Sequence, residues 1–395
     1  MFKTLPWEYG IRNLFRRPLR TVLTLAGLTT VIVLVLIVIG FIRGLETTLE
    51  VSGNPRTGIV FALGMGENLE YSSIPMRSSE LVAASVSGIR QRRGTKYVSP
   101  ELYLGTQIGV KTASVNSAEE PWQETLGLVR GVTPTVRLVR NQIELEDGHW
   151  PNINEVIVGK LAATKLGVAE SDLAIGKTIR MENRVWKVAG HFTCGGAAFE
   201  SEIWCRLDDL QQSMKRQDLS LVALTLAPDG DFADLDLFCK ERLDLELQAM
   251  QEEDYYALLQ RDYQPIRWLA WLVVLLVAGS GIFAGLNTMY GAVVGRVAEI
   301  SMLRTIGFGR RAIALSLIQE ALILCLLASL IACVLAIVLV NGVAVKFTMG
   351  AFQLRIDNIT ILIGCLIGVV LGLVGAVPPA IKALRTQIVE GLRTT

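Results

Sequence analysis

Four strongly apolar runs, with Glu320 in the third, stand out along the 395-residue chain, each long enough to cross a lipid bilayer. About 20 apolar residues, at a rise of about 1.5 Å per residue, cross a hydrocarbon core about 30 Å thick. We place these spans at residues 21–42, 268–295, 312–340 and 358–381. The pattern therefore predicts a membrane protein with four spans.

Between the first two spans, at residues 43–266, the pattern changes to short alternating strands, glycine and proline punctuation, and a few amphipathic helices. This pattern predicts a folded α+β domain of two lobes, the second at about residues 121–215. We expect one helix at Ser79–Arg92, and a charged helical stretch, Asp231–Tyr263, that could continue into the second span as a stalk. The expected strands are Tyr97–Val110, Thr125–Val132, Glu155–Val158, Thr178–Met181 and Val185–Ala189.

Lysines and arginines cluster in the N-terminal tail (1–20), the connection between spans two and three (296–311) and the C-terminal tail (382–395). Basic residues near span ends are retained in the cytoplasm during insertion. Both termini and this connection are therefore expected inside, and residues 43–266 and a short loop at 341–357 outside. The expected fold class is an α-helical membrane protein with four transmembrane helices plus a large α+β extracytoplasmic domain between spans 1 and 2.

Composition agrees with a membrane protein and narrows the chemistry. Hydrophobic residues make up 51% of the chain, charged residues 19%, and the mean hydropathy is +0.44. A net charge of +1 does not favour nucleic-acid binding. The two histidines, His149 and His191, have no second histidine or cysteine pair at metal-ligand spacing. We expect no catalytic residue, bound cofactor or metal on this chain.

One motif resembles a phosphate-binding loop but departs from it. Ser171–Thr178 reads SDLAIGKT, where a serine replaces the first glycine and a strand follows, so a turn is the better interpretation. A disulfide between Cys194 and Cys205 is an open alternative to free thiols, because spacing alone does not establish its geometry.

Small residues repeat every four positions in the fourth span, at Gly364, Gly368 and Gly372. This spacing lets helix backbones approach closely, either within one subunit or at a dimer seam. Glu320 is an exceptional ionisable residue in the apolar runs, and we expect it to pair with Arg310 or Arg311.

The connection after the second span, RVAEISMLRTIGFGRR, has the spacing of a short surface helix. Val297, Ile300, Leu303 and Gly307 recur at helical intervals, and glycine is a common helix stop. The apolar ridge suits insertion into a groove on a partner protein. An amphipathic segment resting at the lipid headgroups is an equal alternative from these residues alone.

Several segments resemble MacB/FtsX-type ABC transporter permeases, a family related to the LolC/LolE permeases. Asn287–Leu324 is similar to the region of the second and third spans, with its pattern N-x-M, R-x-x-E-I-x-x-L-R-x-x-G and a later glutamate. Arg12–Leu28 and Pro378–Arg393 resemble the family's opening and closing segments, with Ile388 in place of the usual proline. Ile175–Phe192 is similar to the MacB-type periplasmic core.

The resemblance implies a MacB-like periplasmic core domain and an FtsX-like permease domain at residues 268–390, in the inner (plasma) membrane. It implies a homodimer of non-catalytic permease subunits in membrane lipid, with two copies of a separate ATPase that binds the ATP, and no nucleic-acid partner. The segment after the second span would be the coupling helix that docks on the ATPase. Its contact residues would be Val297, Glu299, Ile300, Leu303, Arg304, Ile306 and Gly307.

The function expected first is mechanotransmission, in which closure of the ATPases moves the external domains and exports or extracts a hydrophobic or amphipathic cargo, with a periplasmic adaptor. An FtsX-like signalling scaffold that activates a cell-wall hydrolase is the alternative from a different class. A lipoprotein-sorting permease is a third. The large external domain favours export over signalling.

Overall fold

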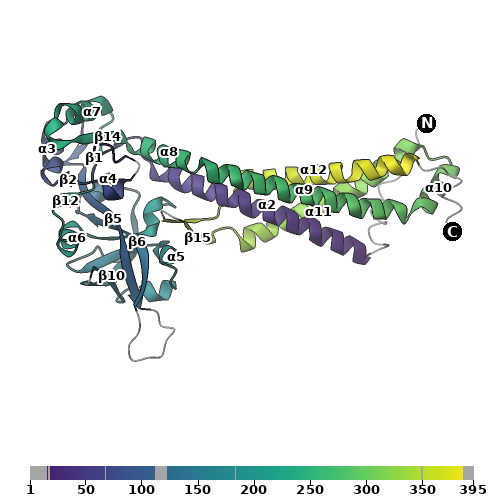
Figure 1. Ribbon diagram of the computed structural model, residues 1–395, viewed down its shortest axis with the longest axis horizontal. Coiled ribbons are helices and arrows are strands. Elements are labelled where there is room, and N and C mark those ends of the chain that lie inside the picture. Colours follow the sequence, from purple (N-terminus) through teal and green to yellow (C-terminus); the bar gives the residue numbers. More distant parts are fainter. Residues whose placement is uncertain are drawn as a thin grey trace. The chain divides into compact units, whose positions relative to one another are not determined.

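The chain forms two compact units, drawn in Figure 1. The computed structural model describes residues 16, 18–66, 68–111, 122–182, 184–347 and 350–385. One unit comprises Met1–Arg43, Pro265–Val343 and Leu354–Thr395, and the other comprises Gly44–Gln264 and Ala344–Gln353. Most of the two tails expected at residues 1–20 and 382–395, including Ile388, lies outside the described residues.

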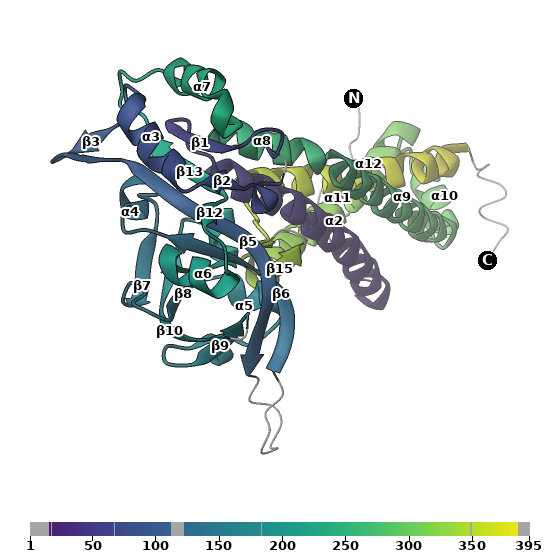
Figure 2. The same cartoon turned by 60° about the vertical axis from the view of Figure 1, so that its left-hand side comes forward.

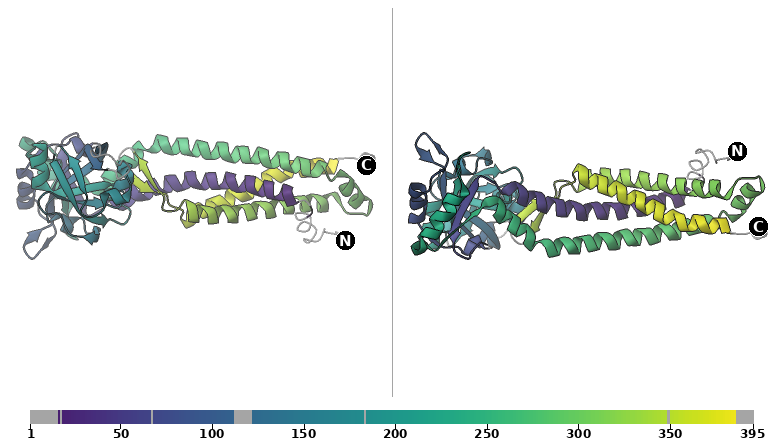
Figure 3. Two further views of the ribbon diagram at one scale, coloured as in Figure 1. Left: turned by 90° about the horizontal axis from the view of Figure 1, so that it is seen from below. Right: turned by 90° about the horizontal axis from the view of Figure 1, so that it is seen from above.

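The first unit is built from long apolar helices, which run alongside one another in Figure 3. Within the described residues, four helices are long and apolar enough to span a membrane. Their positions agree with the four expected spans, except that α2 continues well past residue 42, where the first span was expected to end. The helices are α2 (Pro18–Ser52), α9 (Gln264–Val294), α11 (Arg310–Leu339) and α12 (Asn358–Arg385).

The glycine stripe of α12 packs inside this unit. A Cβ on Gly364 would lie 2.6 Å from Leu36 Cδ2 of α2, and one on Gly372 would lie 3.0 Å from Cys325 Sγ of α11. A Cβ on Gly368 would overlap the hydroxyl of Ser329. These glycines therefore let α12 approach two helices of its own chain, which supports packing within one subunit over a dimer seam.

The start of α12 is tied to α2 by one carboxylate. Asp357 Oδ1 accepts hydrogen bonds from the backbone N–H of Thr360 at 2.8 Å and from its hydroxyl at 2.7 Å. Asp357 Oδ2 accepts from Arg43 Nη2 at 2.7 Å. The first contact satisfies a backbone donor that has no partner within the helix, as side-chain caps do.

The second unit is an α+β domain around one mixed sheet, seen in Figure 2. The sheet order is β14-β1-β13-β5-β6-β11-β8-β10-β7, and β9 pairs with both β10 and β5. Strands β5, β6, β11, β8, β10 and β9 therefore close into a ring, which leaves fewer exposed edges. The strands are β1 (Thr57–Ala62), β5 (Val98–Lys111), β6 (Trp122–Val132), β7 (Glu144–Gly148), β8 (Glu155–Gly159), β9 (Thr178–Met181), β10 (Arg184–Thr193), β11 (Glu202–Arg206), β13 (Leu221–Thr225) and β14 (Leu247–Gln251).

Short helices and two small strand pairs complete the domain. A core cluster contains residues from both halves of the sheet, from Val60 and Leu224 to Val156 and Trp186, so the two lobes share a core and the strand β5. The helices are α3 (Arg77–Ser85), α4 (Val136–Val139), α5 (Ala162–Leu166), α6 (Leu207–Met214), α7 (Phe232–Glu241) and α8 (Glu252–Asp262). The 3-10 turns are η1 (Leu69–Tyr71), η2 (Glu170–Leu173), η3 (Ala198–Ser201) and η4 (Leu243–Leu245), and the small pairs are β2 (Ile74–Pro75) with β12 (Asp218–Leu219) and β3 (Gln91–Arg92) with β4 (Thr95–Lys96).

The expected strands are confirmed, whereas two expected helices are wrong in part. The helix α3 ends at Ser85, and Gly88 adopts φ +70°, a left-handed conformation that a continuing helix does not allow. The stretch Asp231–Tyr263 is interrupted by β14, which pairs with β1. Sheet pairing therefore outweighs the helical pattern of that charged segment.

The loop expected at residues 341–357 contains a hairpin, β15 (Ala344–Phe347) and β16 (Gly350–Gln353), that belongs to the α+β domain. The Phe347 ring lies 5.1 Å from the ring of Tyr263, and Lys165 Nζ of α5 donates to the Phe347 carbonyl at 3.3 Å. The α+β domain is thus built from two segments of the chain, one before the second span and one after the third. No strand was expected in this loop.

Of the two alternatives left open for Cys194 and Cys205, the structure has the free thiols, and both are buried. Cys205 packs in the cluster of Val156 and Val158, whereas Cys194 packs with Trp204, whose side chain leaves β11 on the opposite face. Burial raises the pKa of Cys194 to about 12, so the thiol stays protonated.

We predict that Gly368→Ala lowers the free energy of unfolding by about 1–3 kcal/mol, because the new methyl group overpacks the contact with Ser329. Reversible unfolding of the full chain in mixed micelles measures the change. The matched control is Gly279→Ala, where an added Cβ meets no atom within 4 Å. Equal effects of the two substitutions would contradict the close packing of α12.

Candidate functional site

The connection between α9 and α11 contains the short helix α10 (Val297–Thr305). The expected glycine stop is confirmed at Gly307, which adopts φ +101°. The Gly307 N–H donates to the Arg304 carbonyl and the Phe308 N–H to the Leu303 carbonyl, each at 3.1 Å. These two bonds form a Schellman motif, which satisfies carbonyls at the end of the helix and fixes the turn into α11.

The face of α10 that the sequence marked as its apolar ridge points into its own unit. Ile300 is buried and Leu303 half-buried, in a cluster with Val293, Ile313 and Leu317. Two residues of the expected docking ridge are therefore already packed within their own unit.

The outer face of α10 is formed by residues that share another side of the helix. Met302 is 59% exposed and Ile306 64% exposed, and Glu299 is also exposed. The intervals of three and four residues place them on one face. Of the other expected contact residues, Val297 and Arg304 are half-buried and Gly307 is exposed. We call Glu299, Met302 and Ile306 the outer face.

A buried ion pair joins the start of α10 to α11. Arg296 Nη1 donates to Glu320 Oε2 at 2.9 Å, and Nη2 to Oε1 at 3.2 Å, with both side chains 9% exposed. The expected pairing with Arg310 or Arg311 is wrong. Arg310 is ten residues before Glu320 on one helix, a rise of about 15 Å that exceeds side-chain reach.

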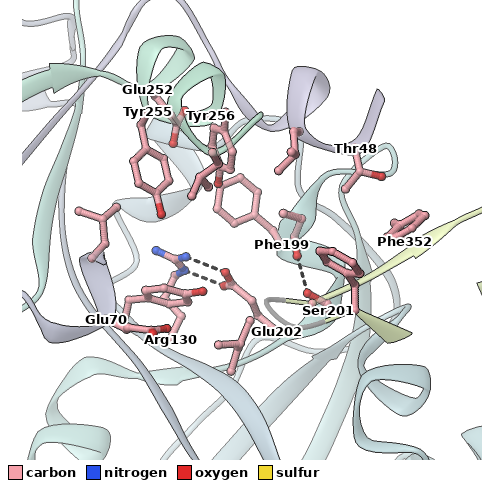
Figure 4. A pocket seen from close by; sticks show the side chains of 18 of the residues that line it. Thr48, Glu70, Arg130, Phe199, Ser201, Glu202, Glu252, Tyr255, Tyr256 and Phe352 are labelled. Atoms are coloured by element: carbon pink, nitrogen blue, oxygen red, sulfur yellow. Dashed lines mark hydrogen bonds and ion pairs between the residues drawn. The ribbon is translucent and has the colours of Figure 1, made fainter. Parts of the chain in front are cut away.

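The α+β domain holds a second cluster of buried charges, shown in part in Figure 4. Arg130 of β6 binds Glu202 of β11 through two bonds, Nε to Oε2 at 2.7 Å and Nη2 to Oε1 at 2.6 Å. Arg130 Nη1 donates to Glu101 Oε2 of β5 at 2.7 Å. The three strands are neighbours in the sheet, so pairing brings these residues together across the chain.

A second arginine extends this cluster. Arg140 Nε donates to Glu101 Oε1 at 3.0 Å, and Nη1 donates to Glu252 Oε1 of α8 at 2.5 Å. Burial would raise the pKa of Glu101, but attraction by Arg140 and Arg130 outweighs it and lowers the pKa. Burial raises the pKa of Glu252 in spite of Arg140. We call Glu101, Arg130, Arg140, Glu202 and Glu252 the buried ion cluster.

The buried ion cluster forms one side of a cavity in the α+β domain (Figure 4). The cavity has an empty volume of about 930 Å³, part of which is open to solvent. Its other walls come from the end of α2, from η1, η3 and α8, and from the hairpin β15–β16, and they are largely aromatic and aliphatic. No sequence pattern indicated this site, because its charged residues lie far apart in the chain.

Two further expectations concern chemistry on this chain. Ser171–Thr178 forms the end of η2, a turn with Gly176 at φ +87° and the start of β9, as the turn interpretation predicted. Within the described ranges, no group of three or more His, Cys, Asp or Glu residues is placed to hold a metal ion.

Two family models match the chain. The model described as the MacB-like periplasmic core domain matches residues 21–236, which is more than half of the chain, and the FtsX-like permease C-terminal model matches residues 271–388. The chain belongs to the MacB/FtsX-type family of ABC transporter permeases. Such permeases in general work with an ATPase partner, form dimers and are not themselves catalytic.

A relative matches this MacB/FtsX-type permease over nearly its whole length. The "Uncharacterized ABC transporter permease YknZ" of Bacillus subtilis (strain 168) is 20% identical over 407 residues, covering 97% of each chain. Among solved structures, the periplasmic region of MacB from Actinobacillus actinomycetemcomitans is 12% identical with a TM-score of 0.39, covering 53% of this chain and 94% of that one. The extracellular domain of YknZ from Gram-positive bacteria is 15% identical with a TM-score of 0.35, covering 49% and 99%.

We predict that Arg140→Ala lowers the free energy of unfolding of the permease by about 3–5 kcal/mol at neutral pH, because Glu101 and Glu252 lose a buried partner. Unfolding of the purified full chain, followed by circular dichroism, measures this loss. Because the pKa of Glu101 is lowered by folding, its contribution is present at neutral pH and is lost as the pH falls through that pKa.

The control for this prediction is Lys160→Ala, which removes an exposed ion pair with Glu146 whose charged atoms lie 3.7 Å apart. Exposed pairs contribute about 0–1 kcal/mol. A loss after Arg140→Ala as small as that of the control would show that the buried ion cluster does not stabilise the domain.

Proposed function

We propose that this permease works by mechanotransmission, with ATP hydrolysis on two separate ATPase subunits that push on α10. The observation that carries the proposal is how α10 is packed against the helices of its unit. The Arg296–Glu320 pair and the apolar cluster of Ile300 and Leu303 hold the helix on α9 and α11, while its outer face stays exposed. A force applied to that face would therefore reach two spans.

The outer face has the chemistry of a protein-docking surface. Met302 and Ile306 supply exposed apolar area beside the charge of Glu299. A short helix that presents such anchors at intervals of three and four residues fits a groove on a partner. The thioether of methionine adapts to irregular surfaces. These features support docking on an ATPase subunit.

We propose that α10 and both termini lie in the cytoplasm and that the α+β domain lies outside, in the plasma membrane of the cell. The support is the basic character of the tails and of the connection around α10, since lysine and arginine are retained on the cytoplasmic side. ATP is available only on that side. In this orientation the ATPase subunits and the outer face of α10 share a compartment.

The proposed cargo is hydrophobic or amphipathic, and its export or extraction is driven by movement of the external domains, together with a periplasmic adaptor. The support is that an ionisable residue within the spans, Glu320, is paired inside the protein. Glu320 is neutralised by Arg296, so this carboxylate is not left to bind a polar substrate. Ionisable residues in spans commonly mark polar substrate pathways, and they do so when they face a cavity.

We propose a homodimer in which α9 lies nearest the second copy. In the apolar window of α9 only 11% of residues are buried, compared with 33–39% in the other three spans. The exposed side chains include Trp268, Leu275 and Phe283. Because the glycine stripe of α12 is used within the subunit, α9 retains the largest free apolar surface for lipid and for a second subunit.

We predict that the double substitution Met302→Asp and Ile306→Asp reduces co-purification of the ATPase at least about tenfold, since carboxylates would be buried in the proposed docking groove. Quantitative co-purification from membranes measures the effect. The matched control is Leu63→Asp, which changes an equally exposed leucine of the α+β domain, 64% exposed. Stoichiometric recovery of the ATPase with the double variant would refute docking through the outer face.

We predict that an impermeant maleimide labels Asp229→Cys in intact cells and labels Gly309→Cys only after lysis. Both positions are exposed, one in the α+β domain and one between α10 and α11. The parent chain, whose cysteines are buried or half-buried, gives the background. Labelling of Gly309→Cys before lysis would reverse the proposed orientation.

A further inference from the structure

We propose that the cavity of the α+β domain is a binding site for a small amphipathic cation, with its charged group beside Glu70 and its apolar part among the aromatic side chains. The binding does not require the ATPase or transport, so the proposal stands apart from mechanotransmission. Three observations support it: an excess of carboxylates in the cavity lining, tyrosine hydroxyls that donate to no protein group, and a largely apolar wall.

The carboxylates that line the cavity, Glu70, Glu202 and Glu252, outnumber the lining cations, Arg130 and Arg140. The buried ion cluster contains three glutamates and two arginines, so it carries one negative charge more than its arginines neutralise. Glu70 of η1 also lines the cavity. It is half-buried and makes no hydrogen bond or ion pair in the described chain. Two lysines lie nearby without lining the cavity: Lys165, whose amine donates to the Phe347 carbonyl, and Lys346, which is close to Lys165.

Nearby cations do not fully offset the burial of Glu70 and Glu252. Burial raises the pKa of Glu70 although Lys165 opposes it, and burial raises the pKa of Glu252 although Arg140 opposes it. A carboxylate with a raised pKa is one whose charged form lacks sufficient favourable interactions. A bound ammonium group would supply that interaction by donating charge-assisted hydrogen bonds to the carboxylate.

Tyrosine hydroxyls at the cavity offer further contacts. Tyr255 and Tyr256 of α8 both line the cavity, and within the described residues their hydroxyls donate to no protein group. In Figure 4 the side chain of Tyr255 points toward Arg130 across the cavity. A tyrosine hydroxyl accepts a hydrogen bond from an ammonium group, and its ring attracts a cation. The rings of Tyr103 and Phe199 are already stacked on Arg130 and Arg140.

The rest of the cavity suits an apolar tail. Its wall includes Leu45 and Leu49 of α2, Leu259 of α8, Tyr263 directly after α8, and Phe352 of β16. The cavity is concave, as pockets that bind small molecules are. Such sites are mainly apolar with a few polar groups that fix orientation, which is the arrangement here.

The test compares three probes of equal length that differ only in their end group: phenylbutylammonium, phenylbutanol and phenylbutyrate. Saturation-transfer NMR with the full chain in lipid nanodiscs, after subtraction of empty nanodiscs, gives each dissociation constant. We expect phenylbutylammonium to bind most tightly. Equal or tighter binding of the alcohol or the carboxylate, or no binding above empty nanodiscs, would overturn the proposal.

Two variants locate the bound probe. Glu70→Gln is expected to weaken phenylbutylammonium binding at least about tenfold and to leave phenylbutanol unchanged. The matched control is Glu80→Gln, which removes an exposed carboxylate of α3 and should change neither constant. Leu259→Trp, which fills the cavity, is expected to abolish binding of both probes, and its melting curve shows whether the domain is folded. Unchanged affinity in Glu70→Gln and in a folded Leu259→Trp protein would place the probe elsewhere and refute the site.

Discussion

Charge taken out of water has to be paired, and this requirement shapes both units of the permease. An unpaired ion in an apolar interior costs several kcal/mol even after relaxation, so a buried carboxylate persists only with a well-placed partner. Glu320 has Arg296 in two-point contact, and Glu101 has both Arg130 and Arg140. In each case the pair joins elements that the chain alone would leave separate: α10 to α11, and β5 to β6 and to the residues around α4.

The Arg296–Glu320 pair and the buried ion cluster differ in their charge balance. Arg296 and Glu320 balance each other, so their contact is a fixed joint between a connection and a span. The buried ion cluster has a surplus of carboxylate and faces a cavity. A balanced pair is suited to transmitting force, because separating it leaves two buried charges. A surplus beside a cavity is suited to receiving a cation, because the protein has already desolvated the site.

Sequence predicted the features that repeat along the chain. Long apolar runs identify spans because lipid requires every backbone polar group to be satisfied within the helix, and alternating residues identified strands such as Thr178–Met181. It did not predict β14 or the ion cluster around Arg130, since each depends on partners distant in sequence. It also missed the hairpin β15–β16, which pairs locally but packs against the distant residues Tyr263 and Lys165. The cysteines show the same limit: their spacing allowed a disulfide, but alternation along β11 places Cys205 away from the cluster of Cys194.

The helix α10 shows why a partner surface is harder to find than a core. Apolar periodicity reports which residues leave water on folding, and at Ile300 and Leu303 it did so correctly. Residues kept for a partner must remain exposed in the free subunit, and the proposed docking residues Met302 and Ile306 are exposed and lie off that ridge. A surface helix fixed to its own protein by one face can dock only through another. The docking face of such a helix is therefore identified by subtracting the packed ridge from the pattern, which requires the structure of the surrounding helices.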